Sequence, residues 1–285
     1  MPNLYKIIEK RILNDLTVFL KVEAPRVAAK ARPGQFVIIR ADETAERVPF
    51  TIAEYNAAAG TVAIIFQTVG AATKKLALKN EGEYLTDFVG PLGNPSELEG
   101  YKNVAVIGGG LGCAIAYPQA KYLHEHGSKV DIIAGFRNTD VIILENEMKS
   151  VCDSLTIMTD DGSNGSKGLV TDGLKAKIDG GEKYDLVIAI GPPIMMKFVC
   201  KLTAQYGIKT VVSLNPIMID GTGMCGGCRV TVGGKTRFAC VDGPDFDGHE
   251  VDFDELMRRN GTYREQEQHA CNLFKAADAK AKENN

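Results

Sequence analysis

Short apolar runs, separated by turn-forming residues, fill the first third of the chain. The clearest of these runs cover residues 16–22, 35–40 and 61–67. Clusters that contain Gly and Pro divide them, for example at residues 32–34 and 90–95. Short strands at this spacing are typical of an antiparallel barrel. We therefore predict a β-barrel over residues 1–98, with one helix inside it over about residues 71–78.

From residue 103 onward, buried strands alternate with helical segments. An apolar run at residues 104–107 leads into the glycine-rich turn 108–112, and a helical pattern covers residues 113–126. Further strands are expected at residues 130–134, 155–159, 186–190 and 210–214. Strands and helices that alternate in this way form a parallel α/β sheet with crossover helices. The pattern therefore predicts a second, Rossmann-like domain over residues 99–214.

The remaining chain differs from both of these parts. A short hairpin is expected over residues 229–232 and 235–239. The last stretch is polar and rich in Ala, Lys and Glu, which indicates one or two surface helices. We assign residues 215–250 to a cysteine-containing loop domain and residues 251–285 to a helical tail.

Composition narrows the class of protein. The 285 residues, 45% hydrophobic and 24% charged, are those of an ordinary globular protein of about two domains. No apolar run reaches about 18 residues and no signal-peptide pattern is present, so we expect neither a membrane span nor secretion. A net charge of −3 offers no basic face, so nucleic acid is not an expected partner. Of the seven cysteines, four are scattered singly, as expected for a reducing, cytoplasmic setting.

The most specific chemistry lies between Asp220 and Cys240. Cys225 and Cys228 form a C-x2-C turn, and Cys240 follows with eleven residues between. Plant-type 2Fe-2S ferredoxins carry C-x4-C-x2-C and a distant fourth cysteine on one cluster. Asp220 stands where the first of those thiolates would be. Glycines at 221, 223, 226 and 227 allow the positive φ angles that bring N–H groups close to sulfur. We predict a one-electron 2Fe-2S centre held by Asp220, Cys225, Cys228 and Cys240.

The residues of this loop also allow other interpretations. Three cysteines could bind structural zinc, with Asp220 or an outside residue as the fourth ligand. Zinc ribbons carry a second C-x2-C or a His pair, and the nearest histidine, His249, has no partner at ligand spacing. A disulfide is another option, although the four other cysteines show no framework. Asp220 could also act only as a turn former. The iron–sulfur interpretation is preferred.

The glycine-rich turn after the first strand of the second domain has the character of a nucleotide site. It contains Gly108, Gly109, Gly110 and Gly112. Such a turn lets the backbone approach a pyrophosphate, and the following helix offers its N–H groups and positive dipole end. Many α/β folds also use glycines here only for packing. Its place after a buried strand favours a dinucleotide site.

Two later strand ends carry further nucleotide-binding candidates. Ligands of open α/β sheets bind outside the carboxyl ends of the strands. The first strand end could bind ribose hydroxyls, or could be a solvated acidic turn, and it contains Asp160, Asp161 and Gly162. The second could frame a nicotinamide, with its methionine as packing, and it contains Gly191, Pro192 and Met195.

The barrel carries two segments with flavin-binding character. The first could pair an Arg with a pyrophosphate, pack an aromatic on the isoalloxazine and bond a flavin nitrogen through a Thr hydroxyl. Its residues are Arg47, Pro49, Phe50 and Thr51. An exposed Arg and a core Phe are the alternative. The second segment places N–H groups and a hydroxyl at a helix start, where a phosphate could bind, through Val69, Gly70 and Thr73. We also include Phe66 among the FAD-binding candidates.

Together these motifs resemble the ferredoxin–NADP reductase flavoprotein superfamily. The cysteine loop narrows the resemblance to the branch that holds dihydroorotate dehydrogenase electron-transfer subunits. With an aspartate in place of the first cysteine, the loop is similar to that of the small subunits of NADH-dependent ferredoxin:NADP oxidoreductases. The matching stretches span most of the chain and are ERVPFTIA (46–53), TDDGSNGSKGLVTD (159–172), IGPPIMM (190–196), SLNPIMIDGTGMCGGCRV (213–230) and CVDGPDFDGHEVDFD (240–254). One departure is visible: the superfamily's Arg would fall on Val48, whereas here Arg47 lies one position earlier.

The resemblance implies FAD between an FAD-binding barrel (1–98) and an NAD(P)-binding domain (99–214), with the 2Fe-2S loop (215–250) beside them. A flavin is needed because NAD(H) exchanges hydride and a 2Fe-2S cluster exchanges single electrons. Arg137, after the second strand of the nucleotide domain, could suit the 2′-phosphate of NADPH. The resemblance favours NAD(H), and we follow it.

The resemblance also implies a partner. In the resembled heterodimeric complex, a large glutamate-synthase-like subunit carries its own FAD and 4Fe-4S clusters, and the pair couples ferredoxin, NADH and NADP by electron bifurcation. Two alternatives remain open. One is an electron-transfer subunit of a dihydroorotate dehydrogenase, although that branch has four cysteines and ends soon after the cluster. The other is a zinc-stapled docking module without catalysis.

Overall fold

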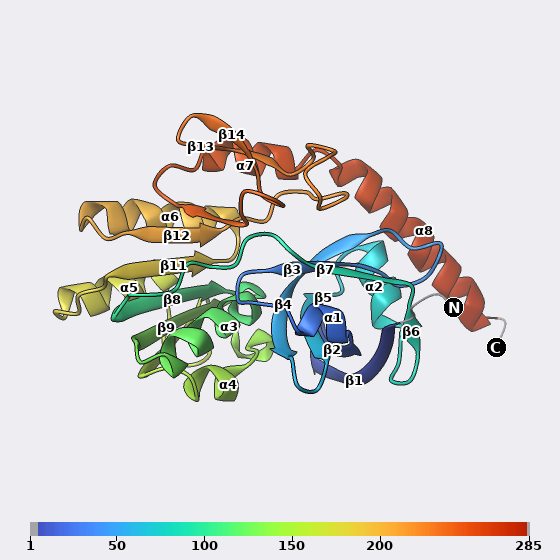
Figure 1. The fold of residues 1–285 in the computed structure, drawn as a ribbon, viewed down its shortest axis with the longest axis horizontal. Helices are drawn as coiled ribbons and strands as arrows, with labels where there is room; N and C mark the ends of the chain where they lie inside the picture. The colour runs from blue at the N-terminus through green and yellow to red at the C-terminus, as the bar shows by residue number, and fades with distance from the viewer. Residues whose placement is uncertain (1–4, 284–285) are drawn as a thin grey trace.

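A computed structural model describes residues 5–283. Their strands form two large sheets and one small hairpin (Figure 1). The first sheet is antiparallel and has the order β6-β1-β2-β5-β4-β3-β7. Its strands are β1 (Tyr5–Asn14), β2 (Thr17–Glu23), β3 (Phe36–Arg40), β4 (Val48–Asn56), β5 (Thr61–Gln67), β6 (Tyr84–Leu85) and β7 (Asp87–Leu92). The edge strands β6 and β7 are consecutive in the chain, with only Thr86 between them, so the sheet nearly closes. This confirms the expected antiparallel near-barrel.

Two helices accompany this sheet, α1 (Pro25–Ala28) and α2 (Ala71–Ala77). The second is the helix that the sequence predicts inside the barrel. The barrel interior is filled by alternate residues of the strands, since successive side chains of a strand point to opposite faces. In β3, Val37 and Ile39 face this interior, whereas Phe36 and Ile38 face the other way and belong to a different core.

The second sheet has the order β10-β9-β8-β11-β12-β15. Its strands are β8 (Asn103–Gly109), β9 (Lys129–Phe136), β10 (Ser154–Thr159), β11 (Leu186–Ile190), β12 (Thr210–Ser213) and β15 (Asp245–Asp247). The first five in this order pair in parallel, and β15 joins β12 antiparallel. The order reverses between β8 and β11, which is the point where open α/β sheets bind ligands. The parallel sheet that the sequence predicts is confirmed.

Helices cover both faces of this sheet (Figure 1). They are α3 (Gly112–Glu125), α4 (Glu145–Lys149), α5 (Val170–Asp179) and α6 (Pro193–Gln205), with a 3-10 turn η1 (Thr139–Val141). In β8, Val104 and Val106 pack in the core beneath α3, and Ala105 and Ile107 pack in the core beneath α5 and α6. A strand buried on both faces needs apolar residues throughout, which explains its continuous apolar run. The core beneath α3 also includes barrel residues such as Phe19 and Ile65, so α3 joins the two domains.

The last part of the chain starts over the α6 side of the parallel sheet and ends beside α2 of the barrel (Figure 1). It contains the hairpin β13 (Arg229–Val232) and β14 (Lys235–Phe238), then α7 (Phe253–Asn260) and α8 (Arg264–Glu283). Asp252 caps α7 by accepting a hydrogen bond from the N–H of Glu255 at 2.8 Å. The strand β15 was not expected from the sequence. It falls within the cysteine-containing segment but completes the sheet of the nucleotide domain.

Within residues 5–283, none of the helices combines the length and the apolar character that a membrane crossing requires.

Candidate cofactor sites

The glycine-rich turn between β8 and α3 packs directly against the start of the β11–α6 connection. A Cβ on Gly112 would lie 2.2 Å from the carbonyl oxygen of Ile190, which is backbone and cannot move aside. A Cβ on Gly109 would lie 2.4 Å from Sδ of Met195 and 3.1 Å from Cδ of Pro192. The turn therefore needs glycine, and two separate sequence motifs meet at one place.

Gly110 is the part of this turn that stays open. Its φ is +55°, and nothing lies within 4 Å of a Cβ placed on it. Its N–H donates to the carbonyl of Gly135 in β9 at 2.8 Å, which ties the turn to the neighbouring strand. Gly191 packs against Gly109 on the other side of the turn. A Cβ placed on Gly191 would lie 3.1 Å from the Cα of Gly109. A ligand can approach the backbone from the Gly110 side, where the strand order reverses.

The ends of β9 and β10 bring the acidic candidates beside Arg137. The N–H of Asp160 donates to the Phe136 carbonyl at 3.0 Å, and the N–H of Asp161 donates to the Arg137 carbonyl at 3.3 Å. The Asp161 carboxylate accepts from the N–H of Ser163 at 2.9 Å, and this bond lowers the pKa of Asp161. One carboxylate oxygen is therefore used within the turn. Gly162, with φ of +80°, allows the turn to form.

On the barrel side, Arg47 lies just before β4 and is held by a carboxylate. Its Nη2 is 2.9 Å from Oδ2 of Asp87, and Nε of Arg40 is 2.7 Å from the same oxygen. The Arg47 side chain is still 54% exposed. The ion pair with Asp87 fixes the direction of Arg47 without removing it from the surface.

The alternation of β4 separates the flavin candidates into two groups. Phe50 packs against Phe66 with ring centroids 5.4 Å apart, and both rings are buried in the barrel core. This is the core role that the sequence left open for Phe50. Pro49 and Thr51 point to the other face and are partly exposed. Together with Arg47, they are the members of this motif whose side chains stay accessible at the surface.

The second barrel segment starts α2. The Thr73 hydroxyl accepts from the N–H of Gly70 at 3.0 Å and lies 3.0 Å from the Gly70 carbonyl, so it caps the helix. Val69 is 65% exposed, and its carbonyl lies 3.7 Å from the Cys271 thiol of α8. The C-terminal helix therefore passes beside the segment in which the sequence predicts phosphate binding.

In the cysteine loop, the Asp220 carboxylate reaches across the turn. Its Oδ1 accepts from the N–H of Thr222 at 2.9 Å, and its Oδ2 accepts from the N–H of Cys225 at 3.0 Å. These hydrogen bonds lower the pKa of Asp220, and the bond from the N–H of Thr222 contributes most to this shift. The side chain is an anion next to the first cysteine of the C-x2-C turn.

Cys228 and Cys240 form the buried half of the same loop. Their sulfurs are 3.2 Å apart, yet no disulfide is formed among the described residues. The N–H of Cys240 lies 3.4 Å from Sγ of Cys228, and the N–H of Gly227 lies 3.4 Å from Sγ of Cys225. Burial raises the pKa of the Cys240 thiol to about 12. A cysteine binds a metal as the thiolate, so metal binding must offset the free energy that burial adds to deprotonation of the thiol.

The four predicted ligands are arranged as two pairs. Among residues 5–283, no three Cys, His, Asp or Glu side chains converge as they do in a metal site. The donor set nevertheless fits an iron–sulfur group, because it joins unpaired thiols, one carboxylate and backbone N–H groups directed at sulfur. Positive φ angles at Gly221, Gly223 and Gly226 give the loop its shape, as expected, whereas Gly227, which was expected to share this feature, does not have a positive φ.

The cysteine loop packs on the barrel, and this contact was not expected from the sequence. Cys228 and Cys240 share one apolar core with Phe36 and Ile38 of β3. A Cβ on Gly221 would lie 2.4 Å from Cδ1 of Ile38, so the loop lies directly on this strand. The continuous apolar run of β3 was the available signal, because a strand with apolar residues on both faces is covered on both faces.

This contact places the cysteines next to the flavin candidates. In the register of β3 with β4, Phe36 pairs with Thr51 and Ile38 pairs with Pro49. The two β3 residues that share the core of Cys228 and Cys240 are thus direct neighbours of the flavin candidates on β4. One strand separates the two sites.

Two family models match parts of the chain. The iron–sulfur cluster binding domain of dihydroorotate dehydrogenase B matches residues 215–252. The oxidoreductase NAD-binding domain matches residues 106–201.

Several relatives match over most of their length. An uncharacterised protein in the adh 3′ region of Clostridium beijerinckii is 54% identical, over 93% of this chain and 92% of its own. A homologue of the dihydroorotate dehydrogenase B (NAD(+)) electron transfer subunit from Thermotoga maritima is 49% identical, over 95% of both chains. The subunit of that name from Clostridium perfringens is 33% identical, over 79% of this chain and 89% of its own.

A solved structure of an NADH-dependent reduced ferredoxin-NADP oxidoreductase, studied for flavin-based electron bifurcation, superimposes with a TM-score of 0.90. It is 46% identical and covers 95% of this chain and 98% of its own. A ferredoxin reductase from carbazole 1,9a-dioxygenase, 19% identical with a TM-score of 0.58 over 72% of this chain and 65% of its own, shares the fold alone.

Proposed function

Since the chain belongs to the family of dihydroorotate dehydrogenase B electron-transfer subunits and their homologues, we propose that it passes electrons between NAD(H), a bound FAD and a 2Fe-2S cluster. Its place among oxidoreductases with NAD and iron–sulfur binding follows from the matching domains. One observation supports the proposal most strongly. The core that holds Cys228 and Cys240 lies on β3, whose pairing partners in β4 include Pro49 and Thr51.

The cluster would be held by Asp220, Cys225, Cys228 and Cys240. A bound 2Fe-2S cluster supplies single-electron transfer, with a potential set by its ligands and by hydrogen bonds to sulfur. The loop contributes N–H groups at 3.4 Å from two of the sulfurs. The barrel contributes Phe36 and Ile38, which shield the buried pair of cysteines from water.

FAD would be held on the barrel by Arg47, Pro49, Thr51, Val69, Gly70 and Thr73, with Phe50 and Phe66 supporting from the core. Bound FAD exchanges both hydride and single electrons, so it can link a hydride carrier, NAD(H), to a single-electron carrier, the 2Fe-2S cluster. Arg47, oriented by Asp87, offers a guanidinium to the pyrophosphate. Pro49 and Thr51 lie on the face of β4 that is turned away from the barrel core.

The nicotinamide nucleotide would lie over the reversal of strand order. Gly110 offers the open backbone, and the packed turn of Gly108, Gly109, Gly112, Gly191, Pro192 and Met195 forms the floor. The ends of β9 and β10 offer Arg137, Asp160, Asp161 and Gly162 to the ribose end. We propose NAD(H) rather than NADP(H), in line with the NAD(+)-dependent relatives.

We propose that the chain acts as the small subunit of a complex with a large glutamate-synthase-like partner that carries FAD and 4Fe-4S clusters. The pair would couple ferredoxin, NADH and NADP by electron bifurcation. Support comes from the 46% identical structure, which aligns over 98% of its own chain. The aspartate at the position of the first cluster thiolate and the helices after Cys240 also favour this partner.

An anaerobic titration with NADH tests the proposed function directly. The purified protein is loaded with FAD, and NADH is added stepwise while the visible spectrum and the EPR signal at low temperature are recorded. We expect loss of the flavin absorbance and the appearance of a 2Fe-2S EPR signal in the same titration. NADPH, added in a parallel experiment, is expected to give a much slower response.

Two outcomes would contradict the proposal. In the first, NADH leaves the flavin absorbance unchanged although FAD is bound. In the second, the flavin is reduced and the EPR signal never appears although iron is present. The second outcome would separate the two cofactors and remove the proposed route along β3 and β4.

A second candidate function is supported by the names of more distant relatives. Subunits of dihydroorotate dehydrogenase B match this chain at 33% identity over 79% of its length. As such a subunit, the chain would serve a partner that oxidises dihydroorotate. The protein that co-purifies from the native host distinguishes the two functions, because the two partners differ in size and in cofactor content.

A further inference from the structure

Helix α7 packs beside the cysteine loop and is fixed there by its apolar face. Phe253 and Leu256 of this helix are buried in one core with Val230 and Val232 of the hairpin strand β13. The strand β13 begins directly after Cys228. A side chain at the end of α7 therefore has a fixed position relative to the cysteine loop.

The last turn of α7 reaches the cysteine loop through two side chains. Nη2 of Arg259 donates to the carbonyl of Gly227 at 3.2 Å. Nδ2 of Asn260 donates to the carbonyl of Asn215, the first residue of the loop, at 3.3 Å. Arg259 lies three positions after the buried Leu256 and therefore on the same side of the helix. The helix thus holds the loop both at its beginning and at its C-x2-C turn.

Gly227 is the point at which Arg259 meets the predicted cluster ligands. It lies inside the C-x2-C turn, directly before Cys228, and its own N–H is 3.4 Å from Sγ of Cys225. A hydrogen bond from a cation is stronger than one between neutral groups. The bond from Arg259 therefore fixes a residue whose N–H is directed at the sulfur of a predicted ligand.

The positive charge of Arg259 is partly withdrawn from water. The side chain is partly buried, and its Nε is buried without a hydrogen-bond partner among residues 5–283. Four other basic residues close in the chain are exposed, and they are Arg229, Lys235, Arg237 and Arg258. Water and salt screen exposed charges, whereas a charge in a low-dielectric environment acts more strongly on its surroundings. Arg259 is therefore placed to act on the C-x2-C turn more strongly than these four residues.

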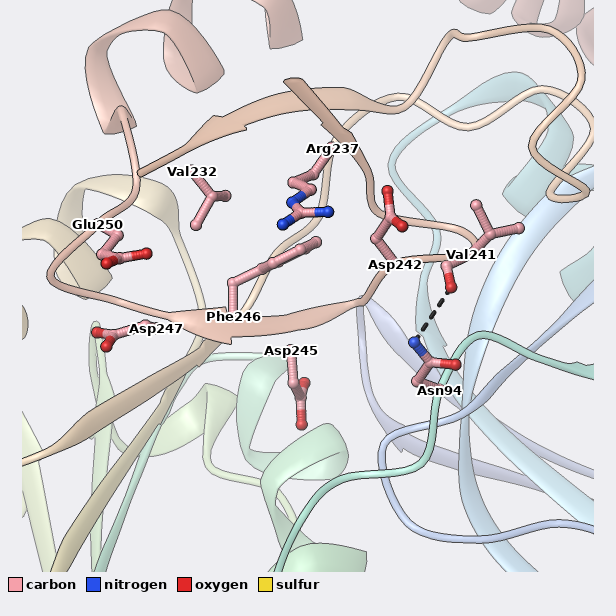
Figure 2. A pocket seen from close by; sticks show the side chains of 9 residues that line it. All are labelled: Asn94, Val232, Arg237, Val241, Asp242, Asp245, Phe246, Asp247 and Glu250. Carbon is pink, nitrogen blue, oxygen red and sulfur yellow. Dashed lines mark hydrogen bonds between the residues drawn. The ribbon is translucent and has the colours of Figure 1, made fainter. Parts of the chain in front are cut away.

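Arg237, in β14, lies among carboxylates. Figure 2 shows its side chain directed from β14 into a hollow beside β15. The hollow has a volume of about 430 Å³, and Asp242, Asp247 and Glu250 are also part of its lining. Because carboxylates near a guanidinium offset its charge, the charge of Arg237 is balanced within the hollow. Arg259 remains the stronger influence on the cysteines.

We propose that Arg259 is a positioning residue for the iron–sulfur centre and that its positive charge raises the midpoint potential of the bound cluster. This role rests on the proposed function, because it takes Cys225 and Cys228 as cluster ligands. Reduction makes a cluster more negative, so a nearby cation stabilises the reduced form. Hydrogen bonds to the sulfurs also set the potential, and Arg259 fixes the residue that supplies one of them. The family model of the cluster-binding domain matches residues 215–252 and so ends before Arg259.

The midpoint potential of the cluster tests this role. Wild-type protein and three variants, all full-length, purified without oxygen and saturated with FAD, are analysed for iron and sulfide and then titrated with EPR detection. In Arg259→Gln, we expect the iron to be kept and the potential to fall by about 59 mV, a tenfold change in the one-electron equilibrium constant. Arg259→Lys keeps the charge and should lie closer to the wild type. The matched control, Arg258→Gln, removes an exposed charge one position away and should leave the potential unchanged.

Several outcomes would overturn the proposal while leaving the cluster itself in place. The first is full iron with a wild-type potential in Arg259→Gln. The second is a shift of equal size in Arg259→Lys or in Arg258→Gln, because the charge at this one position would then not be the cause. The third is loss of iron from both Arg259 variants while NAD⁺ still binds, since the residue would then serve assembly and not the potential.

The iron content separates this role from the proposed function. Loss of iron from Arg259→Gln alone supports the proposal, because the charge that Arg259→Lys retains is then what the loop requires. Wild-type protein without iron contradicts the proposed function itself, and the role of Arg259 falls with it.

Discussion

Serine in place of Cys228 is expected to remove most of the iron and acid-labile sulfide from the purified protein. Cys228 is buried, its sulfur lies 3.2 Å from that of Cys240, and it accepts the N–H of Cys240 at 3.4 Å. A hydroxyl is a much poorer ligand for iron than a thiolate, because iron–sulfur clusters select soft ligands. We expect the iron content to fall about tenfold or more, since even changes next to the ligands cost 10–100-fold in metal affinity.

The matched control is Cys152→Ser. Cys152 lies between α4 and β10, is partly buried and packs against the core beneath α3, whereas Cys228 belongs to a different core. This variant should keep its iron, its sulfide and its visible spectrum. NAD⁺ binding should survive in both variants, because the NAD-binding domain matches residues 106–201 and not the loop. A Cys228→Ser protein that binds NAD⁺ and keeps all of its iron would show that the cluster lies elsewhere.

Replacement of Asp220 by cysteine is expected to keep the cluster and to lower its midpoint potential. The Asp220 carboxylate reaches the N–H of Cys225 at 3.0 Å and occupies the position of the first thiolate in the plant-type pattern. A thiolate donates more charge to iron than a carboxylate does, which stabilises the oxidised cluster. We expect a shift of about 60 mV or more, which is a tenfold change in the one-electron equilibrium constant. A redox titration followed by EPR measures it.

Asp220→Asn separates a ligand from a turn former. Asparagine keeps the carbonyl oxygen that can accept from the N–H of Thr222, so a residue that only shapes the turn should tolerate the change. It loses the anionic oxygen that would bind iron. The ligand role therefore predicts loss of iron in Asp220→Asn and a shifted potential in Asp220→Cys. Full iron in the first variant, together with an unchanged potential in the second, would leave Asp220 as a turn former.

Much of the fold could be predicted from local patterns. The alternation of apolar residues gives the barrel strands, and the run 104–107 followed by glycines gives the first turn of the nucleotide domain. These features depend on residues close together in the chain. The strand β15 could not be predicted in the same way, because Asp245–Asp247 pairs with β12 through a contact between distant segments. The Asp-Phe-Asp sequence carries no strand pattern of its own.

The candidate sites were predictable in residue type more than in position. Cys225, Cys228 and Cys240 stand out because their spacing is rare without a metal. The roles of Phe50 and Phe66 depend on which face of β4 and β5 is inside, and the sequence does not specify this. The contact of Ile38 with the cysteine loop depends on the packing of two domains.

The most direct test of the account is the iron and acid-labile sulfide content of the wild-type protein, purified without oxygen. An iron–sulfur centre held by three thiols and one carboxylate, one strand away from a flavin, predicts about two irons and two sulfides per chain. Protein prepared in this way that contains neither iron nor sulfide would contradict the account.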